Sequence, residues 1–142
     1  MRQAEAARRF LVGVHAGGAT LPRLVLCSSA ARALQTAEIV LPALGTEVTL
    51  EVERDLYTAD ADDVIERLRR VEDEIASVMV VGHNPAFAEL VLLLLSEADT
   101  DGRSRLEPFP TCALAQIGTR TATWGDFVAG SGYLEALFLP ER

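Results

Sequence analysis

Two residues in this sequence, Arg32 and His83, combine a side chain that suits an anion with a position where anions bind. His83 directly follows the apolar run at 77–81 and precedes Pro85, a residue favoured at the first position of a helix. The free N–H groups and positive dipole end of a helix start favour an anion, and an imidazole there can donate to a phosphate oxygen. The position alone also allows a histidine that only caps the turn.

Arg32 follows the apolar run at 23–27 and lies in the first turn of the helix expected after it. Its guanidinium can hold a phosphate through two parallel N–H bonds. The alternative is a surface arginine that pairs with Glu38 or with another carboxylate. Arg32 alone does not decide between these two interpretations, because arginines are common in the sequence.

Hydrophobic periodicity predicts the elements that position these residues. The predicted helices cover 2–14, 30–41, 60–71 and 85–95. The predicted strands cover 23–27, 46–52, 77–81, 111–117, 122–128 and 133–139. The strand at 77–81 is rich in valine and is expected to be buried on both faces, as in the interior of a parallel sheet.

Local signals mark the ends of several of these elements. The glycines at 17–18 end the first helix, and Ser28 and Ser29 supply N-cap chemistry for the second. Asp60 caps the third helix. The polar segment 98–110 contains a glycine and two prolines and is predicted to be a loop.

The alternation of strands and helices predicts an α/β fold with three layers, α/β/α, around an open and mostly parallel sheet. Ligands of such sheets bind at the carboxyl ends of the strands, where the segments 27–32 and 82–84 lie. A length of 142 residues with 49% hydrophobic residues predicts a single domain over residues 1–142.

Composition limits the partners. The net charge of −8 argues against nucleic acid and against an anionic membrane surface, although a local arginine can still bind a phosphate. No apolar stretch is long enough to span a bilayer, which favours a cytoplasmic protein. Cys27 and Cys112 are far apart and lack metal-ligand spacing, so we expect buried free thiols and a reducing compartment.

The segments around Arg32 and His83 resemble two motifs of one family. Residues 28–38, read as SSAARALQTAE, resemble the S-x-x-x-R-A-x-Q-T-A-E signature of the histidine phosphatase superfamily. Residues 80–85, VVGHNP, resemble the turn that holds the second active-site histidine of that superfamily. Leu56-Tyr57 resembles a segment of the SixA-type phosphohistidine phosphatases, and the stretch 109–111 resembles one near the C-terminus of bacterial members.

This resemblance implies a phosphoglycerate mutase-like fold and covalent catalysis by a histidine nucleophile, with no metal or organic cofactor. It also implies that Arg32 and His83 are catalytic residues that bind the phosphoryl oxygens. Ser28 and Asn84 are expected to contribute to the phosphate site. The implied partner is a phosphorylated protein or a small phosphorylated molecule. Glu53 and Asp55 are the nearest candidates for an acid, and an exposed structural role is expected for both.

The sequence departs from the family at the nucleophile, because it contains no Arg-His-Gly motif. His15, the other histidine, follows a helix and not a strand, so we expect it to be a solvated helix-end residue. The resemblance implies that the family's first strand is missing, which would leave unpaired edges in the sheet. We therefore expect a start site assigned too far downstream, or a truncated chain.

Three interpretations follow. The first is a SixA-type phosphatase of phosphohistidine or a related substrate, with its nucleophile in the missing upstream segment. The absence of a large insertion between the two motifs favours this compact type over the phosphoglycerate mutases. The second is a catalytically inactive module that binds phosphate or a partner. The third is an unrelated α/β domain with chance matches.

Overall fold

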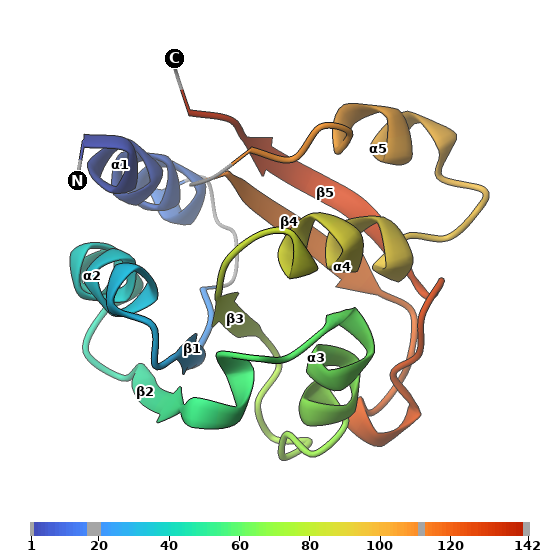
Figure 1. The fold of residues 1–142 in the computed structure, drawn as a ribbon, viewed down its shortest axis with the longest axis horizontal. Coiled ribbons are helices and arrows are strands. Elements are labelled where there is room, and N and C mark those ends of the chain that lie inside the picture. Colours follow the sequence, from blue (N-terminus) through green and yellow to red (C-terminus); the bar gives the residue numbers. More distant parts are fainter. Residues whose placement is uncertain (1, 17–20, 111–112, 141–142) are drawn as a thin grey trace. The chain divides into compact units, whose positions relative to one another are not determined.

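The structure is a computed structural model that describes residues 2–16, 21–110 and 113–140 (Figure 1). It divides into two compact units. The first contains the described residues up to Thr58, together with Glu74–Gly82 and Pro140. The second contains Ala59–Asp73 and the described part of His83–Leu139. The single domain over residues 1–142 stays a prediction.

A parallel sheet forms the centre of the first unit. Its strands are β1 (Leu24–Ser28), β2 (Thr49–Glu53) and β3 (Val78–Val81), in the order β2-β1-β3. Both pairings are parallel, and every residue of β1 is buried. The α/β fold class with a parallel sheet is therefore confirmed.

The register of this sheet aligns the carboxyl ends of its strands. Cys27 of β1 lies opposite Val52 of β2 and Val81 of β3. The next residue of β1 is Ser28, and the first residue after β3 is Gly82. The chain therefore leaves the sheet at the same edge at both positions. We call this the carboxyl edge.

The prediction that residues 77–81 form a strand buried on both faces is wrong. Among the described residues β3 has a strand partner on one side only, and Val78, Met79 and Val80 are half-buried. The apolar sequence does not distinguish the two cases, because β-branched residues also suit a half-buried pleated surface. The fully buried central strand is β1.

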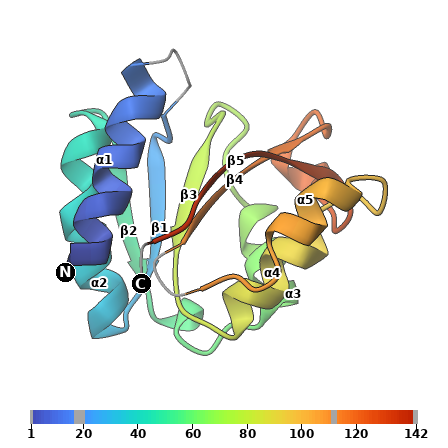
Figure 2. The ribbon, with the colours of Figure 1, turned by 90° about the horizontal axis from the view of Figure 1, so that it is seen from above.

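Two helices lie side by side on the same side of this sheet (Figure 2). They are α1 (Arg2–Ala16) and α2 (Ala31–Val40), and α2 continues into a short 3₁₀ helix, Leu41–Leu44. The buried residues of both helices are mostly small: Ala4, Ala7 and Leu11 in α1, and Ala33, Ala37 and Val40 in α2. Small side chains allow close approach of the two helices.

The ends of these elements differ in detail from the predictions. Helix α1 extends two residues past Val14, and the glycines at 17–18 lie outside the described residues. The N-cap of α2 is Ala30, which makes no side-chain capping bond. The Oγ atom of Ser28 instead accepts from the Ala30 N–H at 3.2 Å, so it stabilises the turn before the helix. Strand β2 begins at Thr49 and not at residue 46.

The second unit contains three helices and an antiparallel strand pair. The helices are α3 (Ala61–Leu68), α4 (Ala86–Leu94) and α5 (Thr100–Arg105). The strands are β4 (Leu114–Thr119) and β5 (Gly132–Phe138). No helix among the described residues has the length and apolar character to cross a membrane.

Asp60 caps α3, as predicted, through a reciprocal pair of hydrogen bonds with Asp63. The Asp63 N–H donates to Asp60 at 2.9 Å, and the Asp60 N–H donates to the Asp63 carboxylate at 3.1 Å. This arrangement satisfies two N–H groups that a helix start leaves free. The helix ends at Leu68, three residues before the predicted end.

Two predictions about the second half of the chain are wrong. Residues 122–128 form no strand, because Thr123 accepts from the Asp126 N–H and closes a 3₁₀ turn, Trp124–Asp126. The predicted loop 98–110 contains α5, whose N-cap is Asp99. The N–H groups of Leu134 and Gly102 donate to Asp99 at 2.9 and 3.0 Å and hold the pKa of that carboxyl below its usual range.

The core of the second unit lies between α4, α5 and the strand pair. Val91, Leu95 and Leu106 are its buried members, and Phe109, Ile117 and Leu134 are among the half-buried residues against it. Gly132 lets β5 approach α4, because a Cβ atom there would lie 2.9 Å from the Leu94 carbonyl oxygen. The Ser96 N–H donates to the Gly132 carbonyl at 2.8 Å and joins the two elements.

Candidate functional site

The first half of the predicted site lies at the carboxyl edge of the first unit. Ser28 ends β1, is fully buried, and uses its Oγ atom as acceptor for the Ala30 N–H. Arg32 lies one turn further along, in the first turn of α2, and is exposed. The first turn of α2 contains no acidic residue that would compete for an anion there.

The guanidinium of Arg32 makes no hydrogen bond or ion pair with any residue that the structure describes. The pairing with Glu38, which the sequence left open, does not occur in this part of the chain. An exposed arginine without a carboxylate partner keeps its five N–H donors for solvent or for an anion.

The second half of the predicted site begins the second unit. His83 and Asn84 follow Gly82 at the end of β3, and both are exposed. Pro85 was predicted to be the first residue of this helix. It is instead the N-cap of α4, and the helix begins at Ala86. The His83 carbonyl accepts from the Phe87 N–H at 3.3 Å, so the turn with His83 leads directly into the helix.

Both polar ends of the Asn84 side chain are engaged within the second unit. Its Oδ1 atom accepts from the Ala88 N–H at 3.1 Å, and its Nδ2 atom donates to the Phe109 carbonyl at 3.1 Å. Sequence reasoning expected this amide at a phosphate. It missed the contact with Phe109, for which no local signal exists because the two residues are 25 positions apart.

The two halves of the predicted site fall in different units. Within the first unit, the parallel register brings Ser28 and Gly82 to the same edge, and Arg32 follows Ser28 through the start of α2. Within the second unit, His83 and Asn84 stand at the start of α4. Chain connectivity joins the halves, since His83 is bonded to Gly82.

Cys27 is the buried thiol at the carboxyl edge. It is fully buried and free, as predicted, and burial raises the pKa of its thiol to about 11. A thiol with that pKa is neutral near pH 7 and is a poor nucleophile. Cys112 and the side chain of His15 lie outside the described residues.

The described residues include no group of three or more histidine, cysteine, aspartate or glutamate side chains that could hold a metal ion. Glu53 and Asp55, the candidate acids, lie at the end of β2 and in the 3₁₀ turn Arg54–Leu56. Glu53 is half-buried and Asp55 is exposed.

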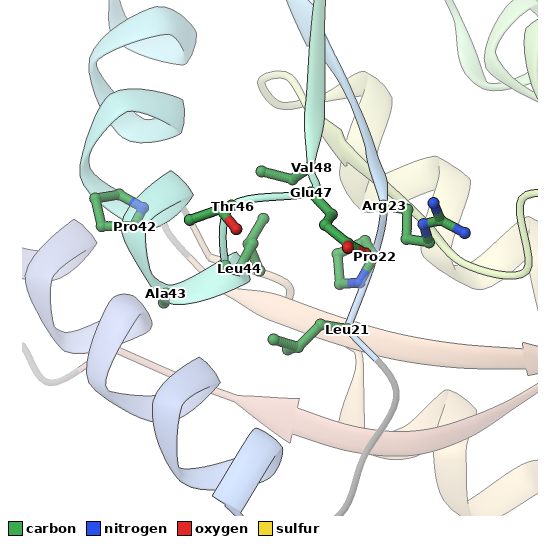
Figure 3. Close-up of a pocket in the computed structure, with 10 residues that line it drawn as sticks. Leu21, Pro22, Arg23, Pro42, Ala43, Leu44, Thr46, Glu47 and Val48 are labelled. Atoms are coloured by element: carbon green, nitrogen blue, oxygen red, sulfur yellow. The ribbon is translucent and has the colours of Figure 1, made fainter.

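A hollow of about 440 Å³ lies at the opposite edge of the same sheet, which we call the amino edge (Figure 3). It is lined by residues 21–23, which precede β1, and by 42–48, which precede β2. Most of its lining side chains are apolar, and in Figure 3 the guanidinium of Arg23 points away from the other labelled side chains. Sequence reasoning did not predict this hollow.

Comparison with known proteins gives relatives in mycobacteria. No protein-family model matches the sequence. An uncharacterised protein of Mycobacterium tuberculosis is 35% identical over 133 residues, which cover 88% of this chain and 81% of the relative. An uncharacterised protein of Mycobacterium leprae is 31% identical over 118 residues, which cover 82% of this chain and 70% of the relative.

Solved structures identify the fold. The putative phosphohistidine phosphatase SixA from Nakamurella multipartitia matches 99% of this chain and 81% of its own, with a TM-score of 0.77 and 26% identity. The chain belongs to one family with the mycobacterial proteins, and its fold is that of the SixA-type histidine phosphatases. A protein histidine phosphatase SixA complexed with tungstate matches 92% of this chain and 76% of its own, with a TM-score of 0.67 and 26% identity.

A third match to the SixA-type fold concerns the fold alone. The putative phosphohistidine phosphatase SixA from Agrobacterium tumefaciens is 24% identical and has a TM-score of 0.77 over 98% of this chain and 79% of its own. The fold expected from the motifs around Arg32 and His83 is therefore confirmed over nearly the whole chain. The interpretation of an unrelated α/β domain with chance matches is wrong.

Proposed function

We propose that this chain forms the phosphate-binding part of a SixA-type phosphatase that hydrolyses phosphohistidine or a related phosphorylated substrate. In this proposal Arg32 and His83 bind the oxygens of one phosphoryl group. The observation that carries it is the register of β1 and β3. Cys27 lies opposite Val81, so the segment that leads to Arg32 and the turn that leads to His83 leave the sheet at the same edge.

The chemistry of the two side chains supports this role. Arg32 is exposed and unpaired among the described residues, and a guanidinium can donate two parallel N–H bonds to a phosphoryl group. His83 stands just before the start of α4, where the positive end of the helix dipole favours an anion, and its imidazole can donate to a phosphoryl oxygen. Positive charge and donors at the phosphoryl oxygens stabilise the charge that spreads over them in the transition state.

The proposal assigns the nucleophile to a histidine that is not among these 142 residues. In the mechanism that the family resemblance implies, a histidine nitrogen attacks phosphorus as the bond to the leaving group breaks. Water then attacks the phosphohistidine, the P–N bond breaks, and phosphate is released. Arg-His-Gly is absent from the sequence, and β3 has a strand partner on one side only among the described residues.

The second candidate is a phosphate-binding module without catalytic activity. The absence of Arg-His-Gly from the sequence favours it, because Arg32 and His83 would then bind a phosphorylated ligand without turnover. The two candidates agree on the ligand and differ in hydrolysis. A phosphohistidine hydrolysis assay on the chain as printed should give no release. Release that depends on His83 would contradict the assignment of the nucleophile to residues outside this chain.

The binding test uses tungstate, an oxyanion found with one of the SixA structures. We expect the wild-type chain to bind it, and Arg32→Ala to weaken binding about ten- to hundredfold, because hydrogen bonds to charged groups are each worth roughly 1.5–3 kcal/mol. His83→Ala should weaken binding by a similar factor. Arg23→Ala is the matched control, since Arg23 is an exposed arginine at the amino edge and should not contribute. Equal effects of Arg32→Ala and Arg23→Ala would contradict the site.

A further inference from the structure

We infer that Asn84 is a positioning residue, which holds His83 in place by tying the start of α4 to the segment around Phe109, and not a ligand of the phosphate. The inference rests on the proposed function of His83 and deepens it. It follows from the partners of one side chain, the Asn84 amide, which lie on two different segments of the second unit.

The oxygen of this amide completes the first turn of α4. The N–H groups of Phe87 and Glu89 donate to the backbone carbonyls of His83 and Pro85, at 3.3 and 3.2 Å. The Ala88 N–H between them donates to the side-chain Oδ1 of Asn84, at 3.1 Å. Three consecutive donors of the helix start are therefore bound by the residues 83–85, and the one in the middle depends on the Asn84 side chain.

The nitrogen of the same amide reaches a distant part of the chain. Nδ2 donates to the Phe109 carbonyl at 3.1 Å, and Phe109 is half-buried against the core formed by Val91, Leu95 and Leu106. The turn with His83 is exposed, whereas its anchor belongs to the core of the second unit. The two hydrogen bonds of the Asn84 amide form a bridge between the start of α4 and Phe109. This bridge restrains the residue next to His83 by connecting it to the core.

An asparagine meets both requirements at this position, whereas an aspartate does not. The oxygen faces a donor and the nitrogen faces an acceptor, so an aspartate would keep the bond to Ala88 and lose the bond to Phe109. Of the two N–H groups of Nδ2, the one that donates to the Phe109 carbonyl is held by that bond and is not available to a phosphate. The bridge lowers the freedom of the backbone beside His83, so less conformational entropy is lost when His83 binds an anion.

The test measures tungstate affinity together with the NMR signals of the two histidine rings. We expect Asn84→Ala to weaken tungstate binding roughly three- to tenfold and to move the His83 ring signals, because a lost hydrogen bond is worth about 0.5–1.5 kcal/mol. The His15 signals serve as an internal reference, since the sequence has only two histidines. Asn84→Asp keeps the acceptor for the Ala88 N–H, so its unfolding midpoint should fall between those of Asn84→Ala and the wild type.

The matched control is Gln116→Ala. Gln116 is another side-chain amide of the second unit, and it donates to Glu135 at 3.1 Å on the strand pair β4-β5. A role of Asn84 in fold stability alone would lower the unfolding midpoint of Asn84→Ala but leave the tungstate affinity and the His83 signals of the folded protein as in Gln116→Ala. That result would overturn the inference.

A measurement on the wild type decides the matter even where a variant does not fold. Asn84 is the only asparagine in the sequence, so its side-chain amide signal can be assigned directly. We expect the hydrogen bond from Nδ2 to the Phe109 carbonyl to persist at saturating tungstate. Its loss would make Asn84 a direct ligand and overturn the inference. If the wild type binds no tungstate, the proposed function fails and this inference with it, whereas binding that is unchanged in Asn84→Ala overturns the inference alone.

Discussion

The carboxyl and amino edges of the sheet in the first unit differ in what they offer a ligand. At the carboxyl edge, β1 ends in the buried Ser28 and leads to the exposed Arg32, which has no partner among the described residues. Gly82 follows β3 at the same edge. At the amino edge, the segments 21–23 and 42–48 surround a hollow of about 440 Å³ with mostly apolar walls.

This difference shows that a hollow of ligand size does not by itself mark the proposed phosphate site. The amino edge has a cavity of ligand size, but no concentration of donors or charges that would select a ligand. The carboxyl edge has the exposed Arg32, whose N–H donors suit the phosphoryl group of the proposed site. Strand β1 runs from one edge to the other. Substitutions in this strand and at the two edges therefore test whether the edges differ as described.

The largest expected effect is on the free energy of unfolding, and it concerns β1, the strand that runs from the amino edge to the carboxyl edge. Leu26 lies in the middle of β1 and is fully buried. Leu26→Ala should lower the free energy of unfolding by about 2–5 kcal/mol, because it leaves a cavity in the core. Val52→Ala is the control, since Val52 lies on β2 and is 47% exposed, and should change stability by less than about 1 kcal/mol. Urea unfolding measures both, and equal losses would contradict the central position of β1.

The next effect is the pH dependence of the stability that Cys27 contributes at the carboxyl edge. The Cys27 thiol has an ordinary pKa of 9.0, which burial raises to about 11 in the folded protein. Because the folded pKa is the higher one, the neutral thiol contributes stability that is complete below pH 9 and lost as the pH rises towards 11. Urea unfolding in a Cys112→Ala background should show this loss between pH 9 and 11, and Cys27→Ala should remove it. A loss of equal size in Cys27→Ala would contradict the burial of the thiol.

The smallest effect is expected at the amino edge. Glu47 is an exposed residue that lines the hollow. Glu47→Ala should leave the tungstate affinity within about twofold of the wild type, because a surface charge at the far end of the sheet is largely screened at physiological salt. Calorimetric titration measures this directly. A change as large as that expected for Arg32→Ala would show that the two edges do not differ as described.

Features set by neighbouring residues were predictable from the sequence. The capping box of Asp60 and Asp63 lies within one turn, and the buried strand β1 is a short apolar run. Arg32 and His83 were predicted as site residues from motifs that are continuous in the sequence, and the structure gives Arg32 the exposed position that the proposal needs.

Features that depend on distant contacts were missed. The edge position of β3 depends on which strands pair with it, and its valines fit an edge strand as well as an interior one. The strand predicted at 122–128 fails because one side chain, Thr123, closes a turn that competes with extended backbone. The bond from Asn84 to Phe109 and the hollow at the amino edge both join segments that are about 20 or more residues apart.

The most direct test of the proposal is a crystal structure of this chain with tungstate bound. We expect one tungstate ion at the carboxyl edge, with the Arg32 guanidinium and the His83 ring both within hydrogen-bond distance of its oxygens. An ion bound by only one of these side chains, or an ion in the hollow at the amino edge, would contradict the proposal that Arg32 and His83 bind the same phosphoryl group.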